Sequence, residues 1–405
     1  MSQWSIIGKG ILTPDKFIKK AGMVIDDGII EKIDSHSSFT VEADGIIVPG
    51  FINSHDHLIG NYYPKVGNGP YENWLPWDND LKSSPIYEER QQIENRDLYL
   101  LAGYRNLLSG VTTISDHIPH FVHEPFLDIM PIKVLRNYAL AHSVVSFALI
   151  WGDDISVEYQ KAAKEKVPFI THSGEGFDDE TIHDIDTLER LGALGEYTVL
   201  IHGIAFNEND IKRIKKAGAS VVWCGDSNMF MFNKTANIKL MLAYGVNVCI
   251  GTDSPMSGGE NLLHEIKFDR KLYKKLFNEE LIDETIVRMI TVNPSYAFKL
   301  SDHGSINPGN VADFVVISRT EDNPYSTVVN AQLEDIALVV INGKPMYGDS
   351  YYKRLFDYHK VKYQEIILRN KQKIVVGDLS GLLRRISKIV GYKKEFPFIP
   401  VEFDI

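Results

Sequence analysis

Short apolar runs alternate with helical stretches through the middle of the chain, between residues 46 and 300. Eight of these runs have the length and composition of strands: 46–54, 111–116, 133–140, 144–151, 167–171, 198–201, 220–224 and 247–252. Strands that are apolar on both faces and alternate with helices are typical of a parallel sheet. Eight of them predict an α/β fold in which residues 46–301 form a (β/α)8 TIM barrel.

One repeat of this pattern is too short. Only three residues separate Leu140, at the end of the third predicted strand, from Val144, at the start of the fourth. A crossover between parallel strands needs a dozen residues or so, usually including a helix. We therefore expect a distorted barrel that lacks the helix between its third and fourth strands.

Two β-rich segments flank the predicted barrel. In residues 1–45, Asp26-Asp27-Gly28 separates two apolar runs and predicts a tight hairpin. Residues 302–350 have the same texture of short β-branched runs joined by Gly, Pro and Asn. Because neither segment alone covers its apolar face, we expect the two to form one composite β-sandwich. Residues 351–405 are expected to form a basic, mostly helical C-terminal extension.

The distribution of charge narrows the classes of partner. The net charge of −11 argues against a nucleic-acid-binding protein. Residues 351–405 nevertheless carry twelve Lys and Arg against six Asp and Glu. We expect this basic segment to pack on the acidic remainder of the chain or on a partner subunit. Binding to RNA or to a membrane surface through it is the alternative.

Composition favours a cytoplasmic protein that folds without disulfides. Apolar residues make up 44% of the 405 positions, which allows a sizeable core. The two cysteines, Cys224 and Cys249, both lie in apolar strand-like runs, as expected in a reducing compartment. The N-terminal residues lack the pattern of a signal peptide, and the apolar run 144–151 is far too short to span a membrane.

The first predicted strand runs into a pair of histidines, His55 and His57, in the sequence H-D-H. Residues i and i+2 of a strand point to the same side. Two imidazoles at this spacing can face the barrel axis and share one ion. A chance pair of surface histidines at a strand end is the plain alternative.

Polar side chains also follow three later strands. His172 and Glu175 follow the fifth strand, His202 the sixth and Asp253 the eighth. The carboxyl ends of the strands form the active face of TIM-barrel enzymes. Three imidazoles and one carboxylate suit one divalent ion, zinc first, with iron or manganese as alternatives. The sequence therefore predicts a metal held by His55, His57, His172 and Asp253, with Glu175 as a proton carrier.

Taken together, the motifs VPGFINSHDH, HSGE, HG and GTDS resemble the amidohydrolase superfamily. The late run GSINPGNVADFVV (304–316) resembles that family's G-x-I-x-x-G-x-x-A-D pattern, so the resemblance extends to about residue 348. Within the superfamily the chain is most similar to the branch of cytosine, guanine and S-adenosylhomocysteine deaminases and triazine chlorohydrolases. The motifs are specific as a set and weak singly.

The resemblance implies a role for each matching residue. It makes His55, His57 and His172 the imidazole ligands and Asp253 a ligand that also takes a proton from the attacking water. Glu175 matches the acid that carries a proton to the substrate. It implies that His202 polarises the substrate or steadies the water, whereas binuclear members use this histidine for a second metal.

Binuclear members usually bridge two ions with a carboxylated lysine at the end of the fourth strand. Residues 141–154 contain no lysine, so one ion is favoured. The resemblance also implies a small-molecule substrate and a homodimer.

The sequence predicts the residues that contact the substrate less clearly than it predicts the metal ligands. His117 follows the second strand and is the first candidate for a substrate contact. Trp74 and Trp77, in the aromatic segment 61–81, either close over a flat substrate or pack the segment onto the barrel. Trp151, at the end of the fourth predicted strand, is a further candidate contact.

We expect hydrolysis of a carbon–nitrogen bond, most specifically deamination of a cyclic or heteroaromatic small molecule by metal-activated water. Cyclic or linear amide hydrolysis on the same site is the first alternative. A metal-binding barrel without turnover is the second, and Glu175 argues against it because a structural site needs no proton carrier. The sequence does not identify the substrate.

Overall fold

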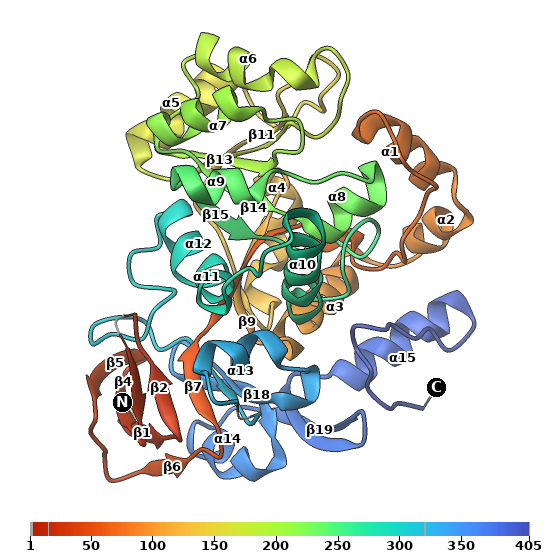
Figure 1. Cartoon of the computed structure of the whole chain (residues 1–405). Coiled ribbons are helices and arrows are strands. Elements are labelled where there is room, and N and C mark those ends of the chain that lie inside the picture. Colours follow the sequence, from red (N-terminus) through yellow and green to blue (C-terminus); the bar gives the residue numbers. More distant parts are fainter. Residues whose placement is uncertain (1–2, 15, 320, 405) are drawn as a thin grey trace.

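The computed structural model describes residues 3–14, 16–319 and 321–404 and places the parallel strands in the middle of the molecule (Figure 1). Two sheets contain them, a three-stranded sheet in the order β10-β9-β8 and a five-stranded sheet in the order β11-β12-β13-β14-β15. The strands are β8 (Phe51–Asp56), β9 (Val111–Asp116), β10 (Lys133–Val134), β11 (Ala139–Ser143), β12 (Phe169–Ser173), β13 (Thr198–His202), β14 (Ser220–Trp223) and β15 (Asn247–Ile250).

These two sheets form the distorted barrel predicted from the sequence. At the seam between β8 and β15, the backbone N–H of Asp253 donates to His55 O at 3.0 Å, and that of Thr252 donates to Asn53 Oδ1 at 3.1 Å. At the other seam, four residues join β10 to β11 without a helix. The missing helix is therefore confirmed, although it lies earlier in the chain than we predicted.

The prediction of a fourth strand at 144–151 is wrong. This segment is a loop that leads into α5 (Ile155–Glu165), and Leu149 and Ile150 are 44% and 95% exposed. The third predicted strand divides into β10 and β11, so β11 takes the place of the fourth strand. The apolar composition of 144–151 reflects two buried residues at its start, Val144 and Val145, and exposed apolar side chains after them, rather than a strand between a sheet and its helices.

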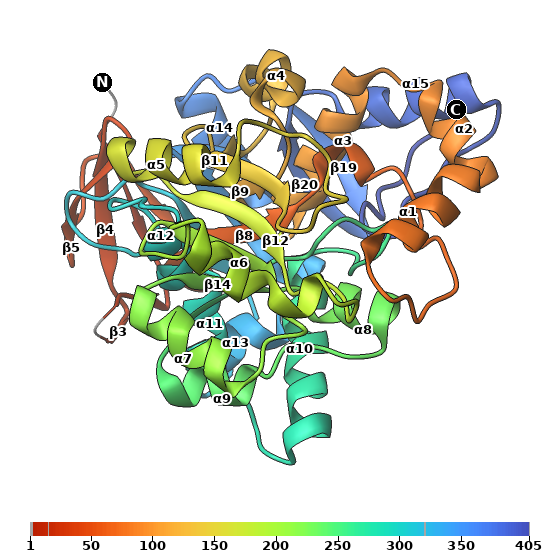
Figure 2. The ribbon, with the colours of Figure 1, turned by 90° about the horizontal axis from the view of Figure 1, so that it is seen from above.

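Helices surround the strands on the outside (Figures 1 and 2). Helix α7 shows how the sequence sets their limits, because Asn207 and Asp210 form a capping box and Gly218, at φ 77°, ends the helix. This helix is α7 (Glu208–Ala217), and the others around the barrel are α3 (Asn95–Leu108), α4 (His120–His123), α6 (Asp184–Arg190), α8 (Gly225–Phe232), α9 (Ile238–Tyr244), α10 (Leu262–Phe277), α11 (Asp283–Met289) and α12 (Val292–Ala297). Before α3, the aromatic segment leads into α1 (Trp74–Ser83) and α2 (Pro85–Gln91).

Both flanking segments contribute to the β-sandwich. One sheet has the order β5-β4-β1-β6, from β5 (Ile29–Ile33), β4 (Gly22–Asp26), β1 (Trp4–Ile7) and β6 (Thr40–Glu42). The other has the order β19-β20-β18-β17-β16-β7-β2-β3, from β19 (Tyr363–Leu368), β20 (Lys371–Val376), β18 (Lys344–Asp349), β17 (Ile336–Ile341), β16 (Phe314–Ile317), β7 (Ile46–Pro49), β2 (Gly10–Leu12) and β3 (Phe17–Lys19). The hairpin at Asp27-Gly28 joins β4 to β5, with both residues at positive φ.

Gly50 divides the first predicted strand into a sandwich strand, β7, and a barrel strand, β8. A Cβ at this position would lie 2.4 Å from Thr112 Oγ1 on the neighbouring strand β9, so only glycine lets the two strands approach so closely. The sandwich therefore extends to residue 49, beyond the predicted limit at 45, and connects directly to the strand that carries His55.

The C-terminal segment is not mostly helical. Its strands β19 and β20 extend the larger sandwich sheet, so the sandwich does not end at residue 350 as predicted. Its helices are α14 (Lys353–Tyr358) and α15 (Leu379–Val390), and α13 (Pro324–Asn330) precedes it. The basic residues pack on the acidic body, as expected: Arg385 pairs with Asp97 of α3 at 2.9 Å, and Lys394 pairs with Glu89 at 2.8 Å. Helix α15 lies beside α3 (Figure 2).

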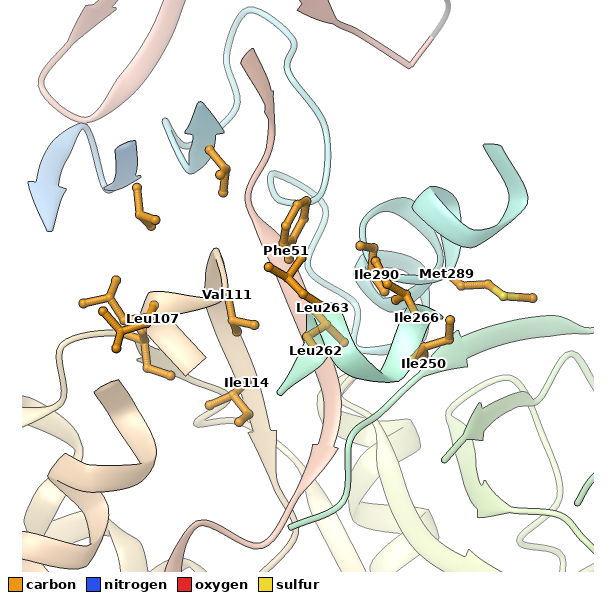
Figure 3. Packing of buried hydrophobic residues seen from close by; sticks show 14 of the residues in the cluster. Phe51, Leu107, Val111, Ile114, Ile250, Leu262, Leu263, Ile266, Met289 and Ile290 are labelled. Carbon is orange, nitrogen blue, oxygen red and sulfur yellow. The ribbon is translucent and has the colours of Figure 1, made fainter. Parts of the chain in front are cut away.

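The core joins the barrel to its helices. Side chains of β8, β9, β15 and the helices α3, α10 and α11 pack together around Phe51 (Figure 3). Burial of such side chains contributes roughly 1.5–3 kcal/mol each and holds the strand ends in place. No helix in the described parts of the chain is long and apolar enough to cross a membrane.

Candidate metal centre

Four histidines and one aspartate converge at the carboxyl ends of the barrel strands. His55 lies in β8 and His57 directly follows it, His172 lies in β12 and His202 in β13, and Asp253 lies three residues beyond β15. Nitrogen and oxygen atoms of His55, His57 and His172 lie within 4.8 Å of one another, and so do those of His55, His202 and Asp253. The described residues therefore include a group that can hold a metal ion.

His55 is the centre of this group and the best test of whether a metal fits it. Its side chain is not exposed, and neither ring nitrogen has a hydrogen-bond partner among the described residues. A buried polar atom without a partner is costly. The Nε2 atom lies 3.8 Å from Asp253 Oδ1, and the ring lies 4.8–5.7 Å from the rings of the other three histidines. A cation in their midst satisfies this nitrogen, so the residues fit a metal.

Hydrogen bonds behind the imidazoles orient the other histidines. Backbone carbonyls accept from the Nδ1–H of His57, at 3.1 Å, and of His172, at 2.6 Å. Because a carbonyl can only accept, the proton resides on Nδ1 and the Nε2 lone pair is free for a metal. The pKa values of His55 and His172 lie well below their usual range, chiefly because of burial and then because of neighbouring imidazoles, so the rings stay neutral as metal ligands must.

Asp253 is held by three donors. Its Oδ2 accepts from the hydroxyls of Ser227, at 2.7 Å, and Ser257, at 2.6 Å, and its Oδ1 accepts from the backbone N–H of Ser254 at 2.9 Å. Burial acts to raise the pKa of Asp253, but neighbouring imidazoles and these hydroxyls hold it below its usual range. The backbone of Asp253 has φ 50°, an uncommon conformation that is often found at functional sites.

Glu175 lies beside the same group. Its Oε1 lies 3.5 Å from Nε2 of His202, whose Nδ1 donates to Asn228 Oδ1 at 2.8 Å. Burial raises the pKa of Glu175 well above its usual range, and the negative charges of Asp253 and Asp184 raise it further. A protonated carboxyl in this position can give a proton to a bound molecule.

The aromatic segment 61–81 pairs with the backbone next to Glu175. Asn73, which caps α1, forms an antiparallel bridge with Gly176, and the N–H of Phe177 donates to Glu72 O at 2.8 Å. Two chain segments far apart in the sequence therefore fix the position of the loop that carries Glu175.

The predicted substrate contacts lie at different distances from this centre. The ring of His117 is fully buried and contacts His172, at 4.5 Å between ring centroids, while its Nε2 hydrogen-bonds to Ala141 O. Trp151, although it lies in a loop rather than a strand, packs 5.3 Å from His117 and 6.4 Å from His57. Trp77 donates to Val66 O and packs the aromatic segment on itself. Substrate contact by these three residues stays a prediction.

Sequence reasoning missed His142, which packs beside the candidate contact Trp74. The ring of His142 lies 4.5 Å from Trp151, 4.6 Å from Trp74 and 5.4 Å from His172. His142 lies in β11, near the end of the true fourth strand, and the misplaced strand at 144–151 concealed it. A correct strand assignment would have found it by the same rule that found His172 and His202.

A second missed residue supports the centre from behind. Arg105 is fully buried and donates to Asp56 Oδ2 at 2.6 Å, to Asn61 Oδ1 at 2.9 Å and to Gly259 O at 2.8 Å. Asp56 lies between His55 and His57 in the chain. The position of Arg105 on α3 gives no sign of this role in the sequence, because a lone arginine on a helix usually faces solvent.

Comparisons with known proteins found similar sequences and similar folds. Residues 154–346 match the model of the Amidohydrolase family. A 5-methylthioadenosine/S-adenosylhomocysteine deaminase from Pyrococcus furiosus is 24% identical over 400 residues, which cover 82% of this chain and 92% of the relative. A 5'-deoxyadenosine deaminase from Methanopyrus kandleri is 25% identical over 417 residues, which cover 85% of this chain and 95% of the relative.

Solved structures share the fold at low sequence identity. An adenosine deaminase from Xanthomonas campestris with bound zinc is 16% identical, covers 95% of this chain and 97% of its own, and has a TM-score of 0.73. An atrazine chlorohydrolase from Arthrobacter aurescens in complex with zinc is 16% identical, covers 95% of this chain and 100% of its own, and has a TM-score of 0.75. These likenesses establish the barrel and its accompanying sandwich.

Proposed function

The resemblance of this chain to the amidohydrolase superfamily is confirmed, and from it we propose that the protein removes an amino group from a heteroaromatic small molecule by hydrolysis. The observation that carries the proposal is the meeting of a buried His55 without hydrogen-bond partners, Asp253 and a Glu175 whose burial favours its protonated form. A metal-ligand group and a proton donor are thereby present at one strand-end face, as hydrolytic deamination requires.

The cofactor we propose is one zinc ion. His55, His57, His172 and Asp253 would hold it. Bound there, it would supply the positive charge that lowers the pKa of a water molecule to about 7. The end of β11 carries His142 and Ser143 and no lysine, which supports one ion over two. Iron or manganese suits the same donors.

The protein side chains divide the proton transfers between them. We propose that Asp253 accepts a proton from the attacking water through Oδ1, since its Oδ2 is occupied by two hydroxyls. Glu175 donates a proton to a ring nitrogen of the substrate, and His202, with Nδ1 bound to Asn228, presents Nε2 to the same space. Asp253 then passes its proton to the amino group, which leaves as ammonia, and the proton of the new hydroxyl restores Glu175, so one water is consumed per turnover.

The class of substrate follows from the relatives and the surroundings of the site. Two relatives are named as deaminases of adenosine derivatives, which supports a purine nucleoside as the substrate. The rings of Trp74, Trp151 and His142 pack against one another beside His172, as a wall for a flat ring requires. We further propose a homodimer in a reducing compartment, where the buried free thiols of Cys224 and Cys249 stay reduced.

Metal analysis followed by an ammonia-release screen tests the proposal. The screen covers adenosine, 5'-deoxyadenosine, 5'-methylthioadenosine, S-adenosylhomocysteine, guanine, cytosine and an aminotriazine, with cyclic and linear amides beside them. We expect about one zinc per chain and ammonia from at least one purine. Activity confined to amides supports the alternative hydrolase, and a metal-loaded protein that turns over neither class contradicts both.

A further inference from the structure

A cavity of about 400 Å³ is lined by residues that adjoin, in the chain, the serines around Asp253. Four parts of the chain form its walls: the residues after β8, the start of α8, the residues from Pro255 to His264, and the C-terminal residues beyond α15. The lining side chains are Tyr62, Tyr63, Pro64, Lys65, Asp226, Pro255, Gly258, Glu260, His264, Lys394, Glu395, Phe396, Pro397 and Phe398. Pockets of this volume are in the range that small ligands occupy.

The cavity is separate from the substrate face of the centre. Its lining includes none of the histidines that converge on the metal position, nor Glu175. The cavity and the converging histidines therefore share no lining side chain.

Three residues that line the cavity are each adjacent in the chain to a serine that donates a hydrogen bond to Asp253. Asp226 precedes Ser227, Pro255 follows Ser254 and Gly258 follows Ser257 in the chain. All three of these serines donate to the carboxylate. A ligand in the cavity thus packs against residues that are adjacent in the chain to these three serines. The position of the serines in turn fixes the carboxylate of Asp253.

The lining also indicates the chemistry of the occupant. Four aromatic rings and three prolines offer flat apolar surface, which suits a planar ring. Charged side chains of both signs lie beside them, namely Lys65, Lys394, Asp226, Glu260 and Glu395.

The charges of the cavity are also largely paired already. Asp226 binds Lys65 at 2.6 Å and His264 at 3.3 Å, and Lys394 binds Glu89. An anion or a cation would each meet a like charge. An uncharged ligand meets none.

We propose that this cavity binds an uncharged, planar heteroaromatic molecule and that binding there strengthens the hold of Asp253 on the metal. The ligand packs against Pro255 and Gly258 and restricts the turn that carries Ser254 and Ser257. Donors that are already ordered cost less entropy when the metal binds, so the two binding events favour each other. The binding site itself does not depend on the proposed deamination, whereas the coupling depends on the proposed metal ligands.

Caffeine is a suitable probe, because it is flat, uncharged and has no exocyclic amine to lose. Calorimetric titration of the metal-free protein with caffeine is expected to show one site. In His264→Trp, whose added ring enters the cavity, affinity falls at least tenfold. The matched control is Lys275→Trp on the outer surface of the same helix, where affinity is unchanged. A second blocking variant at an exposed wall residue, Glu260→Trp, gives the same loss if His264→Trp does not fold.

Zinc release to a chromogenic chelator tests the coupling. Saturating caffeine is expected to slow release at least threefold in the unmodified protein and to have no effect in the blocked variant. Equal caffeine affinity in the blocked and control variants overturns the site. Equal zinc release with and without caffeine overturns the coupling. A chain that binds caffeine but no zinc contradicts the proposed metal centre and leaves the cavity site supported.

Discussion

The guanidinium of Arg105 lies 2.6 Å from the carboxylate of Asp56, and neither side chain is exposed. The same guanidinium donates to Gly259 O at 2.8 Å and to Asp253 O at 3.4 Å. One buried cation thus links the strand that carries His55 and His57 to the turn that carries Asp253, across the seam between β8 and β15. The geometry of the metal centre depends on this link as well as on the ligands.

Replacing Arg105 with methionine is therefore expected to destabilise the protein strongly. It leaves Asp56 buried without its counter-charge, and breaking a buried pair in this way costs about 3–5 kcal/mol. Urea unfolding measures the loss. Arg96→Met, on the exposed side of the same helix, is the control and should change stability by less than about 0.5 kcal/mol. A similar small effect at both positions would show that the buried pair contributes nothing.

Glu175→Gln is expected to keep the fold and the metal and to lose activity. The amide retains the shape of the side chain but has no proton to give, and loss of a general acid typically lowers kcat by 10²- to 10⁴-fold. Metal content and ammonia release are measured on the same preparation. The exposed neighbour Asp179→Asn serves as the control and should retain full activity. Undiminished turnover in Glu175→Gln removes the proposed acid.

Removing the hydroxyl of Ser227 or Ser257 is expected to weaken metal binding without unfolding the protein. Each hydroxyl fixes Oδ2 of Asp253, and groups that orient a ligand are worth about 10- to 100-fold in metal affinity. Competition with a chelator of known affinity measures the effect for the Ala variants. Ser326→Ala, which removes a hydroxyl bonded to Asp283 far from the strand ends, is the matched control. Zinc affinities equal to the parent in both variants contradict the assignment.

Chelation of the metal is expected to lower the thermal stability of the unmodified protein. Binding to the folded chain alone stabilises it by about 2.7 kcal/mol at a hundredfold excess over Kd. Calorimetry before and after chelation, and again after zinc is restored, measures the change. His55→Ala should abolish this response, because the variant lacks the central ligand. A response that survives in His55→Ala places the ion elsewhere.

The stability of the sandwich is expected to depend on pH through His359. Its ring packs edge-on to Trp4 at 5.4 Å, and its buried Nε2 has no hydrogen-bond partner among the described residues. Burial, and then the positive charge of Lys344, lowers the pKa of His359 from 6.5 to about 4. The unfolded chain therefore takes up the proton first as the pH falls from about 6.5 to about 4, and stability is lost across that window.

The variant His359→Phe should show a shallower loss of stability over the same pH range. Denaturant unfolding at several pH values measures the slope. Exposed His36→Phe is the control and should keep the slope of the parent. Identical slopes in all three proteins would exclude His359 as the source of the dependence.

Local sequence pattern predicted the parts of the fold in which pattern and burial agree. The strand at 111–116 is found as predicted, because both of its faces are buried and its neighbours are helices. The convergence of His55, His57 and His172 was predicted correctly because the strand-end rule depends only on chain position. The prediction of a strand at 144–151 was wrong because an apolar loop and a buried strand can have the same composition. Only their neighbours in the fold distinguish them.

Tertiary context decided the rest. Burial of Arg105 depends on Asp56 and Asn61, which no local pattern connects to it. The hairpin β19–β20 did have a local signal, since Arg369-Asn370 joins two alternating runs and both residues adopt positive φ. The prediction of a mostly helical extension did not take this alternation into account.

The pairing of β7 with β16 sets a condition on the synthesis of the protein. Pro49 lies opposite Phe314, so β7 leaves the ribosome long before the strand that completes its ladder. At typical rates of translation the delay is on the order of ten seconds to a minute. During that interval the apolar N-terminal strands have an open edge, which a chaperone or the growing barrel must shield from other nascent chains.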